Sequence, residues 1–166
     1  MGKPVSIYSG KSTSVKGAYS ITVPQPNSEF ESYGAVATAS GGVCKVWGTG
    51  RDHESDNYGT SVRDAFNRLR AILDGKYGQS DEISFLRAKA LWDAEREWTM
   101  SIKQGERTVV AYWTRKNGLA LPDGLTAIML QVKATSSSSA YLNLTYEFEN
   151  FATCQQNIRA VESEGL

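Results

Sequence analysis

A continuous helical pattern from Ser80 to Gln104 is the longest periodic segment of the chain. Apolar side chains recur there at intervals of three and four residues, along one side of a helix: Ile83, Leu86, Ala90, Ala94, Trp98 and Ile102. Ser80 is a favourable N-cap, and Gly105 can adopt the left-handed conformation that ends a helix. A second apolar set, which includes Trp92, widens this surface beyond one stripe. We therefore predict a helix over 80–104 that lies at the centre of the packing.

After this segment the apolar period changes from helical to two. Alternation of this kind predicts strands with one apolar face. The alternating positions are Val109, Ala111 and Trp113, then Ile128, Leu130 and Val132, and finally Leu142, Leu144, Tyr146 and Phe148. Turn signals at Asn117-Gly118 and at Pro122-Asp123-Gly124 separate the runs. This pattern predicts a C-terminal antiparallel meander packed on the helices.

The first 60 residues are typical of extended structure. Val5 and Ile7 alternate with polar neighbours, and so do Tyr19, Ile21 and Val23. The runs 33–40 and 43–48 predict a hairpin that turns at Ser40-Gly41-Gly42. A shorter helix is predicted from Ser61 to about Asp74. The fold class is therefore α+β and mainly antiparallel β, with N-terminal strands, a central two-helix segment and the meander.

The chain has 166 residues, a length that favours one domain over 1–166. We expect an N-terminal arm over about 1–30 and a C-terminal arm over about 151–166. The 18 basic residues balance the 18 acidic ones. Long-range electrostatic attraction is therefore not the main way in which the protein would recruit a partner. The sequence shows no signal-peptide pattern and no apolar run long enough for a membrane span. We expect a cytoplasmic protein without a membrane partner.

The two cysteines, Cys44 and Cys154, lie far apart and form no CxxC motif. The chain also has a single histidine, so a zinc site with two histidines is excluded. We interpret the cysteines as buried free thiols, and we expect no metal and no cofactor.

Potential cation ligands gather in one polar loop that contains Asp52, His53, Glu54 and Asp56. Their spacing does not match an EF-hand, because no bidentate acid follows at the closing position. An exposed acidic loop before a helix is the simpler interpretation. Any enzyme that uses a histidine would have to use His53, and the sequence offers no substrate for it. We expect no catalytic residues.

An aromatic and basic set is the candidate contact for nucleic acid or glycan. Arg107, Trp113 and Arg115 share one side of a predicted strand, and Lys45 lies close to Trp47 on another. The alternative places Trp113 in the core, with the arginines at the wet ends of the strand. Arg63, Arg68 and Arg70 lie on the shorter helix, either as a second basic patch or as a solvated face.

The closing segment SSSSAYLNLTYEFEN, which ends with Glu147 and Glu149, resembles the last strand of small viral coat proteins with a jelly-roll fold. In that group a serine- or glycine-rich connection leads into an alternating aromatic and aliphatic strand. The resemblance implies a non-enzymatic, self-assembling shell or filament subunit of a virion, whose partners are copies of itself. The alternative function is a nucleic-acid or glycan binding module.

Overall fold

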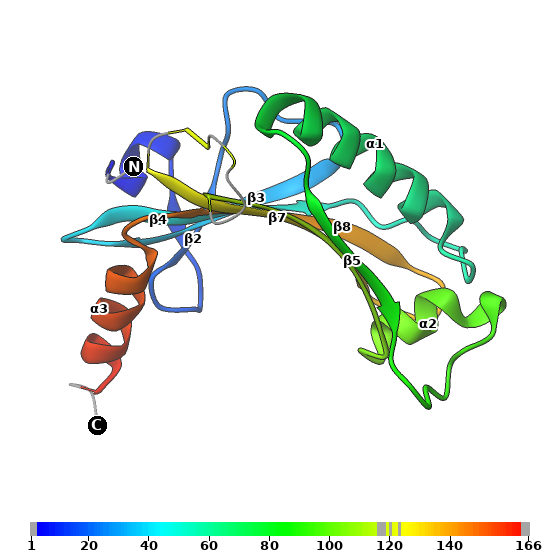
Figure 1. The fold of residues 1–166 in the computed structure, drawn as a ribbon. Coiled ribbons are helices and arrows are strands. Elements are labelled where there is room, and N and C mark those ends of the chain that lie inside the picture. Colours follow the sequence, from blue (N-terminus) through cyan, green and yellow to red (C-terminus); the bar gives the residue numbers. More distant parts are fainter. Residues whose placement is uncertain (1–2, 116–118, 120, 123, 164–166) are drawn as a thin grey trace.

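The computed structural model describes residues 3–115, 119, 121, 122 and 124–163, apart from the side chains at 7, 8 and 161–163. Within this part, one antiparallel sheet of eight strands forms the centre of the fold, in the order β1-β2-β3-β4-β8-β7-β6-β5 (Figure 1). The elements are η1 (Val5–Tyr8), β1 (Lys11–Ser12), β2 (Ala18–Ile21), β3 (Phe30–Thr38), β4 (Gly42–Gly50), α1 (Thr60–Tyr77), β5 (Asp81–Leu86), η2 (Glu95–Glu97), α2 (Trp98–Lys103), β6 (Arg107–Thr114), β7 (Leu125–Ala134), β8 (Ala140–Phe148) and α3 (Phe151–Ser163). The expectation of a mainly antiparallel β fold is confirmed.

The predicted hairpin and the predicted meander are both present. β3 pairs antiparallel with β4 across the turn at 39–41, with a bulge between Val36 and Ala37. β6, β7 and β8 follow one another as an antiparallel meander. The turn expected at Asn117-Gly118 lies outside the described residues, as does Asp123 of the second turn. β8 then returns to the centre of the sheet and pairs with β4, which joins the N-terminal and C-terminal strands.

The shorter of the two predicted helices is α1, which provides most of the helical packing. It runs from Thr60 to Tyr77, three residues beyond the predicted end at Asp74. Val62, Phe66 and Leu69 are buried on its sheet-facing side. Gly59 precedes it with φ of 66°, and a Cβ there would lie 2.0 Å from the Trp98 ring. A glycine is therefore required by both conformation and space at the start of α1.

The long helix predicted over 80–104 is wrong. Residues 81–86 form β5, which pairs with β6 at the edge of the sheet, and a loop leads to a short helix, α2 (Trp98–Lys103). Ile83 and Phe85 also fit the period of two that is typical of a strand. The backbone of β5 forms its hydrogen bonds with β6, whereas in a helix it would have formed them within the segment. Trp98 and Ile102 are buried as expected, whereas Leu91 is 82% exposed.

The Glu106 carboxylate holds the loop that replaces the middle of that predicted helix. Its Oε2 accepts hydrogen bonds from the Leu91 and Trp92 amides, both at 2.9 Å, and Arg87 pairs with Oε1 at 3.1 Å. The Trp92 hydrogen bond is the largest cause of a lowered pKa at Glu106, with Leu91 and Arg87 acting in the same direction against the opposing effect of burial. In a helix, the Leu91 and Trp92 amides would donate to backbone carbonyls. Here the buried Glu106 carboxylate accepts both of these hydrogen bonds instead.

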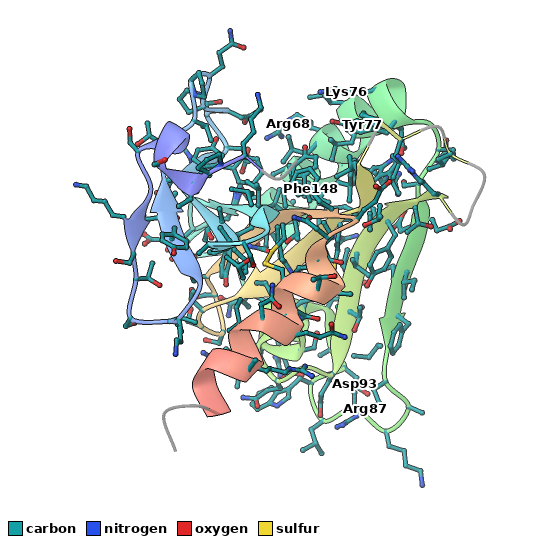
Figure 2. The ribbon with its side chains drawn as sticks, turned by 90° about the vertical axis from the view of Figure 1, so that its left-hand side faces the viewer. Arg68, Lys76, Tyr77, Arg87, Asp93 and Phe148 are labelled. Carbon is teal, nitrogen blue, oxygen red and sulfur yellow. A yellow bond between two sulfur atoms is a disulfide. The ribbon has the colours of Figure 1, made fainter. Side chains whose placement is uncertain are left out.

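The cysteines are not free thiols, so that interpretation is also wrong. Cys44 on β4 and Cys154 on α3 form a disulfide that links segments 110 residues apart (Figure 2). Sequence separation could not reveal it, because the sheet order brings β4 next to the strand that precedes α3. The residues expected as a C-terminal arm therefore include a helix tied covalently to the sheet.

The residues expected as an N-terminal arm form η1 and the outer strands. Val5 and Ile7 lie in a 3-10 helix and not in the predicted strand. Val5 packs instead against a small cluster that contains Ile21, Ala35 and Val43. β1 and β2 extend the sheet beyond β3.

The two faces of the sheet are covered differently. α1 and α2 share one face, where a single apolar cluster includes Phe66, Trp98, Trp113 and Leu142. α3 lies on the opposite side of the sheet, against β3 and β4 (Figure 1). Among the described residues, no helix covers that opposite face over β5, β6, β7 and β8 (Figure 1). We call this region the open face.

Candidate functional site

The free edge of β5 (Asp81–Leu86) carries exposed apolar side chains. Ile83 is 44% exposed and Phe85 is 53% exposed, and β5 pairs with β6 alone. The opposite edge is β1, a strand of two residues that begins with Lys11. Short edge strands and lysines are devices that prevent pairing between sheets, whereas a longer edge with apolar side chains invites it. Within the described sheet, β5 is therefore the edge suited to receive another strand.

The backbone of β5 presents a defined set of groups to its free side. The Arg87 amide donates to the Glu106 carbonyl at 2.7 Å, just beyond the β5–β6 ladder. Because bonding groups alternate along an antiparallel strand, the odd-numbered residues bond toward β6. Glu82, Ser84 and Leu86 consequently direct their N–H and C=O groups outward.

The side chains of β5 divide between the two faces of the sheet. Glu82 and Ser84 line a cavity with residues of α1, so the even positions lie on the helix-covered face. The odd positions, including Ile83 and Phe85, lie on the open face. That face continues inward across the neighbouring strands as Thr108, Val110, Tyr112, Met129, Gln131, Lys133, Tyr141, Asn143 and Thr145. Val110 and Thr145 are buried there, and the other positions combine two tyrosines, a methionine and uncharged polar groups with one lysine, a composition suited to contact with another macromolecule.

Trp113, the centre of the expected aromatic contact, lies in the core. Its side chain is 0% exposed, and its Nε1 donates to Asp74 Oδ1 at 3.1 Å and to the Gly78 carbonyl at 2.9 Å. The strand face that contains Val109 and Ala111 is covered by helices, which explains its burial. Trp113 is therefore unavailable for stacking on a base or sugar, and the expectation that it forms part of an exposed contact is wrong.

The other expected contact residues do not form one surface. Lys45 pairs with Glu147 at 3.0 Å and lies over the Phe151 ring, next to α3. Trp47 lies against Gly34, where an added Cβ would be 2.1 Å from the ring. Arg115 is at the far end of β6 and pairs with Glu149 at 3.0 Å.

Arg107 instead meets Arg63 of α1 at the Trp98 ring. The two guanidinium carbons lie 5.8 Å and 5.7 Å from the ring centroid. Burial, followed by the charge of Arg63, lowers the pKa of Arg107. No carboxylate of the described residues lies within ion-pair distance of either guanidinium. The structure thus brings together one arginine from each of the two basic sets noted in the sequence.

Two cavities open beside these arginines. The inner one, of 200 Å³, is lined by Arg63, Trp98 and Arg107 together with Asn67, Glu82 and Ser84. The Glu82 carboxylate is engaged by Arg70. The outer one, of 330 Å³, is lined by the same three residues with Tyr58, Thr60, Asp93 and Glu95. We call this region the arginine cleft.

His53 connects two segments and is not part of an exposed ligand cluster. Its Nε2 lies 2.9 Å from Glu29 Oε1, and its Nδ1 lies 2.7 Å from Ser61 Oγ at the start of α1. Arg68 of α1 lies 3.5 Å from the second Glu29 oxygen. The arrangement has the residue types of a serine hydrolase, but Ser61 lines neither cavity of the arginine cleft, although its neighbour Thr60 lines the outer one. It ties the segment before β3 to α1.

The side chains of the acidic loop do not come together as a metal site. In the part of the chain that is described, no group of three or more histidine, cysteine or acidic side chains is placed to hold a metal ion. Asp56 accepts a hydrogen bond from the Ser61 amide, and Asp52 accepts one from the Thr135 hydroxyl. None of the described helices has both the length and the apolar character needed to cross a bilayer.

Comparison with models of known protein families, with curated proteins and with solved structures finds no match.

Sequence reasoning missed the edge strand because it assigned Ile83 and Phe85 to a helix. The alternation of polar and apolar residues from Glu82 to Phe85 was the available signal. For Arg63 and Arg107 no signal was available, because 44 positions separate them and only the packing of α1 over β6 brings them together.

Proposed function

We propose that this protein is a non-enzymatic structural subunit that assembles with copies of itself, as a viral coat protein does. The single observation that carries the proposal is the edge strand β5 (Asp81–Leu86), which exposes Ile83 and Phe85 beside backbone groups that no other described strand pairs with. A monomeric protein gains nothing from exposing such an edge, whereas a subunit uses it to extend the sheet.

The difference between the two faces of the sheet supports this proposal. One face is covered by α1 and α2, while the open face has no helix over β5 to β8 among the described residues. β8 pairs with β4 and so joins the N-terminal and C-terminal strands, while the disulfide ties α3 to β4, so the subunit is a firm unit for repeated contacts. The resemblance of residues 136–150 to the closing strand of small viral coat proteins points in the same direction.

The assembly proposal is tested by mass in solution. Light scattering across the micromolar range should give a mass of at least twice the 18.2 kDa of the chain. Phe85→Lys places a charge on the edge and should lower the mass toward that of one chain. Ile72→Lys is the matched control, because Ile72 is also exposed but lies on α1. Equal masses for the two variants would contradict the role of β5.

A second candidate function, binding of single-stranded nucleic acid, is favoured by the arginine cleft. Two guanidinium groups beside one tryptophan ring, with no carboxylate of the described residues at ion-pair distance, are suited to a phosphate group. Asp93 and Glu95 at the outer cavity oppose an anion, so the inner cavity is the better place for it.

This candidate is tested with a single-stranded RNA oligonucleotide. Arg63→Gln and Arg107→Gln should each weaken binding and should each reduce the salt dependence by about 0.7 in the logarithmic slope. Arg68→Gln is the control, because Arg68 lies on the same helix but already faces Glu29. Binding that is equal in all three variants, or absent from the unmodified protein, would reject the cleft as a nucleic-acid site.

A further inference from the structure

The geometry of β5 points to one particular partner, the β5 strand of a second copy. We propose that two subunits pair through β5 (Asp81–Leu86) in antiparallel orientation about a two-fold axis at Ser84. The sheets of the two copies then form one continuous sheet. This inference rests on the proposed function, since it names the contact through which the subunits assemble.

The direction of the backbone groups limits the registers that are available. Only Glu82, Ser84 and Leu86 direct their N–H and C=O groups away from β6. An axis at Ser84 pairs Ser84 with Ser84 of the second copy and Glu82 with Leu86, so all three outward residues bond. An axis one residue away at Ile83 would pair Glu82 with Ser84 and would bring Leu86 opposite the buried Ser80.

The side chains on the open face select the same register. An axis at Ser84 places Ile83 opposite Phe85 of the second copy, and the symmetry repeats this pair on the other side of the axis. Aromatic and β-branched side chains in such cross-strand positions stabilise a sheet. Both side chains are about half exposed in the single subunit, so pairing would bury apolar surface.

The charges at the two ends of β5 are complementary in this register. Asp81 begins the strand and Arg87 follows it, and an axis at Ser84 places each opposite the other from the second copy. The Arg87 side chain pairs with Glu106 but remains 62% exposed, so it can also face the second copy. Moving the axis to Phe85 would place Arg87 opposite Ile83 and would lose the match.

The Glu82 side chain does not oppose the pairing. It lies on the helix-covered face, where Arg70 of α1 engages its carboxylate. Leu86 of the second copy would therefore meet a neutralised acid. The opposite edge, β1, has only two residues, one of which is Lys11, and is a poor partner for another strand. Pairing of β5 with β5 therefore joins two copies and does not continue from edge to edge into a longer sheet.

Cysteine cross-linking tests the register directly. Both native cysteines are paired with each other, so an introduced thiol is the only free one. Residues in a hydrogen-bonded antiparallel pair have Cα atoms roughly 5.5 Å apart, within the range of a disulfide. Ser84→Cys should therefore form a covalent dimer under mild oxidation. Ser20→Cys, an exposed position on β2, should remain a single chain under the same conditions.

A mixture of two variants adds a second test of the axis. Ile83→Cys and Phe85→Cys should form a mixed disulfide more readily than either forms with itself, because these positions face each other only across an axis at Ser84. Each chain can be given a different affinity tag so that mixed and self dimers are distinguished by mass. More self dimer than mixed dimer would contradict the register.

A proline variant tests the hydrogen bonds. Ser84→Pro removes an N–H that faces solvent in the single subunit, a change that edge strands tolerate, but it removes both bonds of the central pair in the dimer. We expect dimerisation to weaken roughly tenfold or more by sedimentation, while Ser84→Val retains it. If Ser84→Pro does not fold, the cross-link of Ser84→Cys decides.

The outcomes separate this inference from the proposed function. A protein that is oligomeric with or without Ser84→Pro, and whose Ser84→Cys variant does not cross-link beyond the Ser20→Cys control, assembles through another surface and overturns the β5 pair alone. A protein that is monomeric throughout the micromolar range overturns both.

Discussion

The indole nitrogen of Trp113 on β6 and the carboxylate of Asp74 on α1 form a hydrogen bond of 3.1 Å between Nε1 and Oδ1. The same oxygen accepts a bond of 2.9 Å from the Ser80 amide, just before β5. One carboxylate thus connects the end of α1, the entry to the edge strand and the centre of the meander. Because the indole has its partner inside the fold, Trp113 acts in packing and not in ligand contact.

Removal of this carboxylate should destabilise the protein. Asp74→Ala leaves the buried Trp113 indole with only the Gly78 carbonyl and leaves the Ser80 amide without its acceptor. We expect a loss of about 1–3 kcal/mol in the free energy of unfolding, measured by urea denaturation. Gln79→Ala is the control, since Gln79 is exposed and its contact with Asp74 is 3.4 Å long. A loss no larger than that of the control would contradict the role of Asp74.

The Cys44–Cys154 disulfide should contribute to stability through the length of chain that it closes. It spans 110 residues, and a loop of this size is expected to contribute about 4.7 kcal/mol by restricting the unfolded state. Cys44→Ser combined with Cys154→Ser should therefore lower the melting temperature, and a reductant should lower that of the unmodified protein alone. Identical melting of both proteins with and without reductant would show that the bond is absent or inert.

The Glu106 carboxylate should make the 87–94 loop sensitive to acid. Its pKa is lower in the folded protein than in the unfolded chain, because the Trp92 and Leu91 amides and Arg87 stabilise the charged form. The charged Glu106 therefore stabilises the fold fully above the usual glutamate pKa of about 4.3. This stabilisation is lost as the pH falls through the lower pKa of Glu106 in the folded protein. Glu106→Gln should flatten the acid limb of the stability profile and speed amide exchange at Leu91 and Trp92. Unchanged exchange at both amides would exclude this role.

Two glycines should respond in opposite directions to replacement by alanine. A Cβ at Gly34 would lie 2.1 Å from the Trp47 ring, so Gly34→Ala should destabilise the protein by about 1–3 kcal/mol through overpacking. A Cβ at Gly75 would meet nothing within 4 Å, and Gly75 lies inside α1. Gly75→Ala should therefore stabilise by about 0.5–1 kcal/mol. Thermal unfolding of both variants checks the pair, and a shared sign would contradict one of the two arguments.

His53 should matter for stability and not for chemistry. His53→Ala removes the group between Glu29 and Ser61 and leaves Glu29, whose side chain is 14% exposed, with only the distant Arg68. We expect a loss of about 1–3 kcal/mol in unfolding experiments. Glu54→Ala, at an exposed position of the same loop, should have little effect. Ester hydrolysis that depends on both His53 and Ser61 would contradict a purely structural role.

The sequence was sufficient to predict the strands of the meander and the β3–β4 hairpin, because their alternation and their turn residues agree. It was also sufficient for α1, since the stripe of Val62, Phe66 and Leu69 has no competing period. The segment 80–104 satisfied a helical period over its whole length, but Ile83 and Phe85 satisfied a strand period as well. The interactions that favour the strand and loop over the helix are the pairing with β6 and the hydrogen bonds to Glu106. Both depend on residues beyond the segment.

The candidate sites were less accessible to sequence reasoning. Arg107 was recognised, but its companion Arg63 could be found only once α1 was placed over the sheet. For Trp113 the sequence allows both a contact surface and the core, and the apolar Val109 and Ala111 on the same side favour the core, where the structure places it. The free edge at β5 depends on strand order, which no local pattern encodes.

The most direct test of assembly through β5 is the mass of the unmodified protein in solution beside that of Ser84→Pro, measured by sedimentation across the micromolar range. The account predicts a mass of at least twice 18.2 kDa for the unmodified protein and a shift toward one chain for the variant. A single-chain mass for the unmodified protein at every concentration would contradict it.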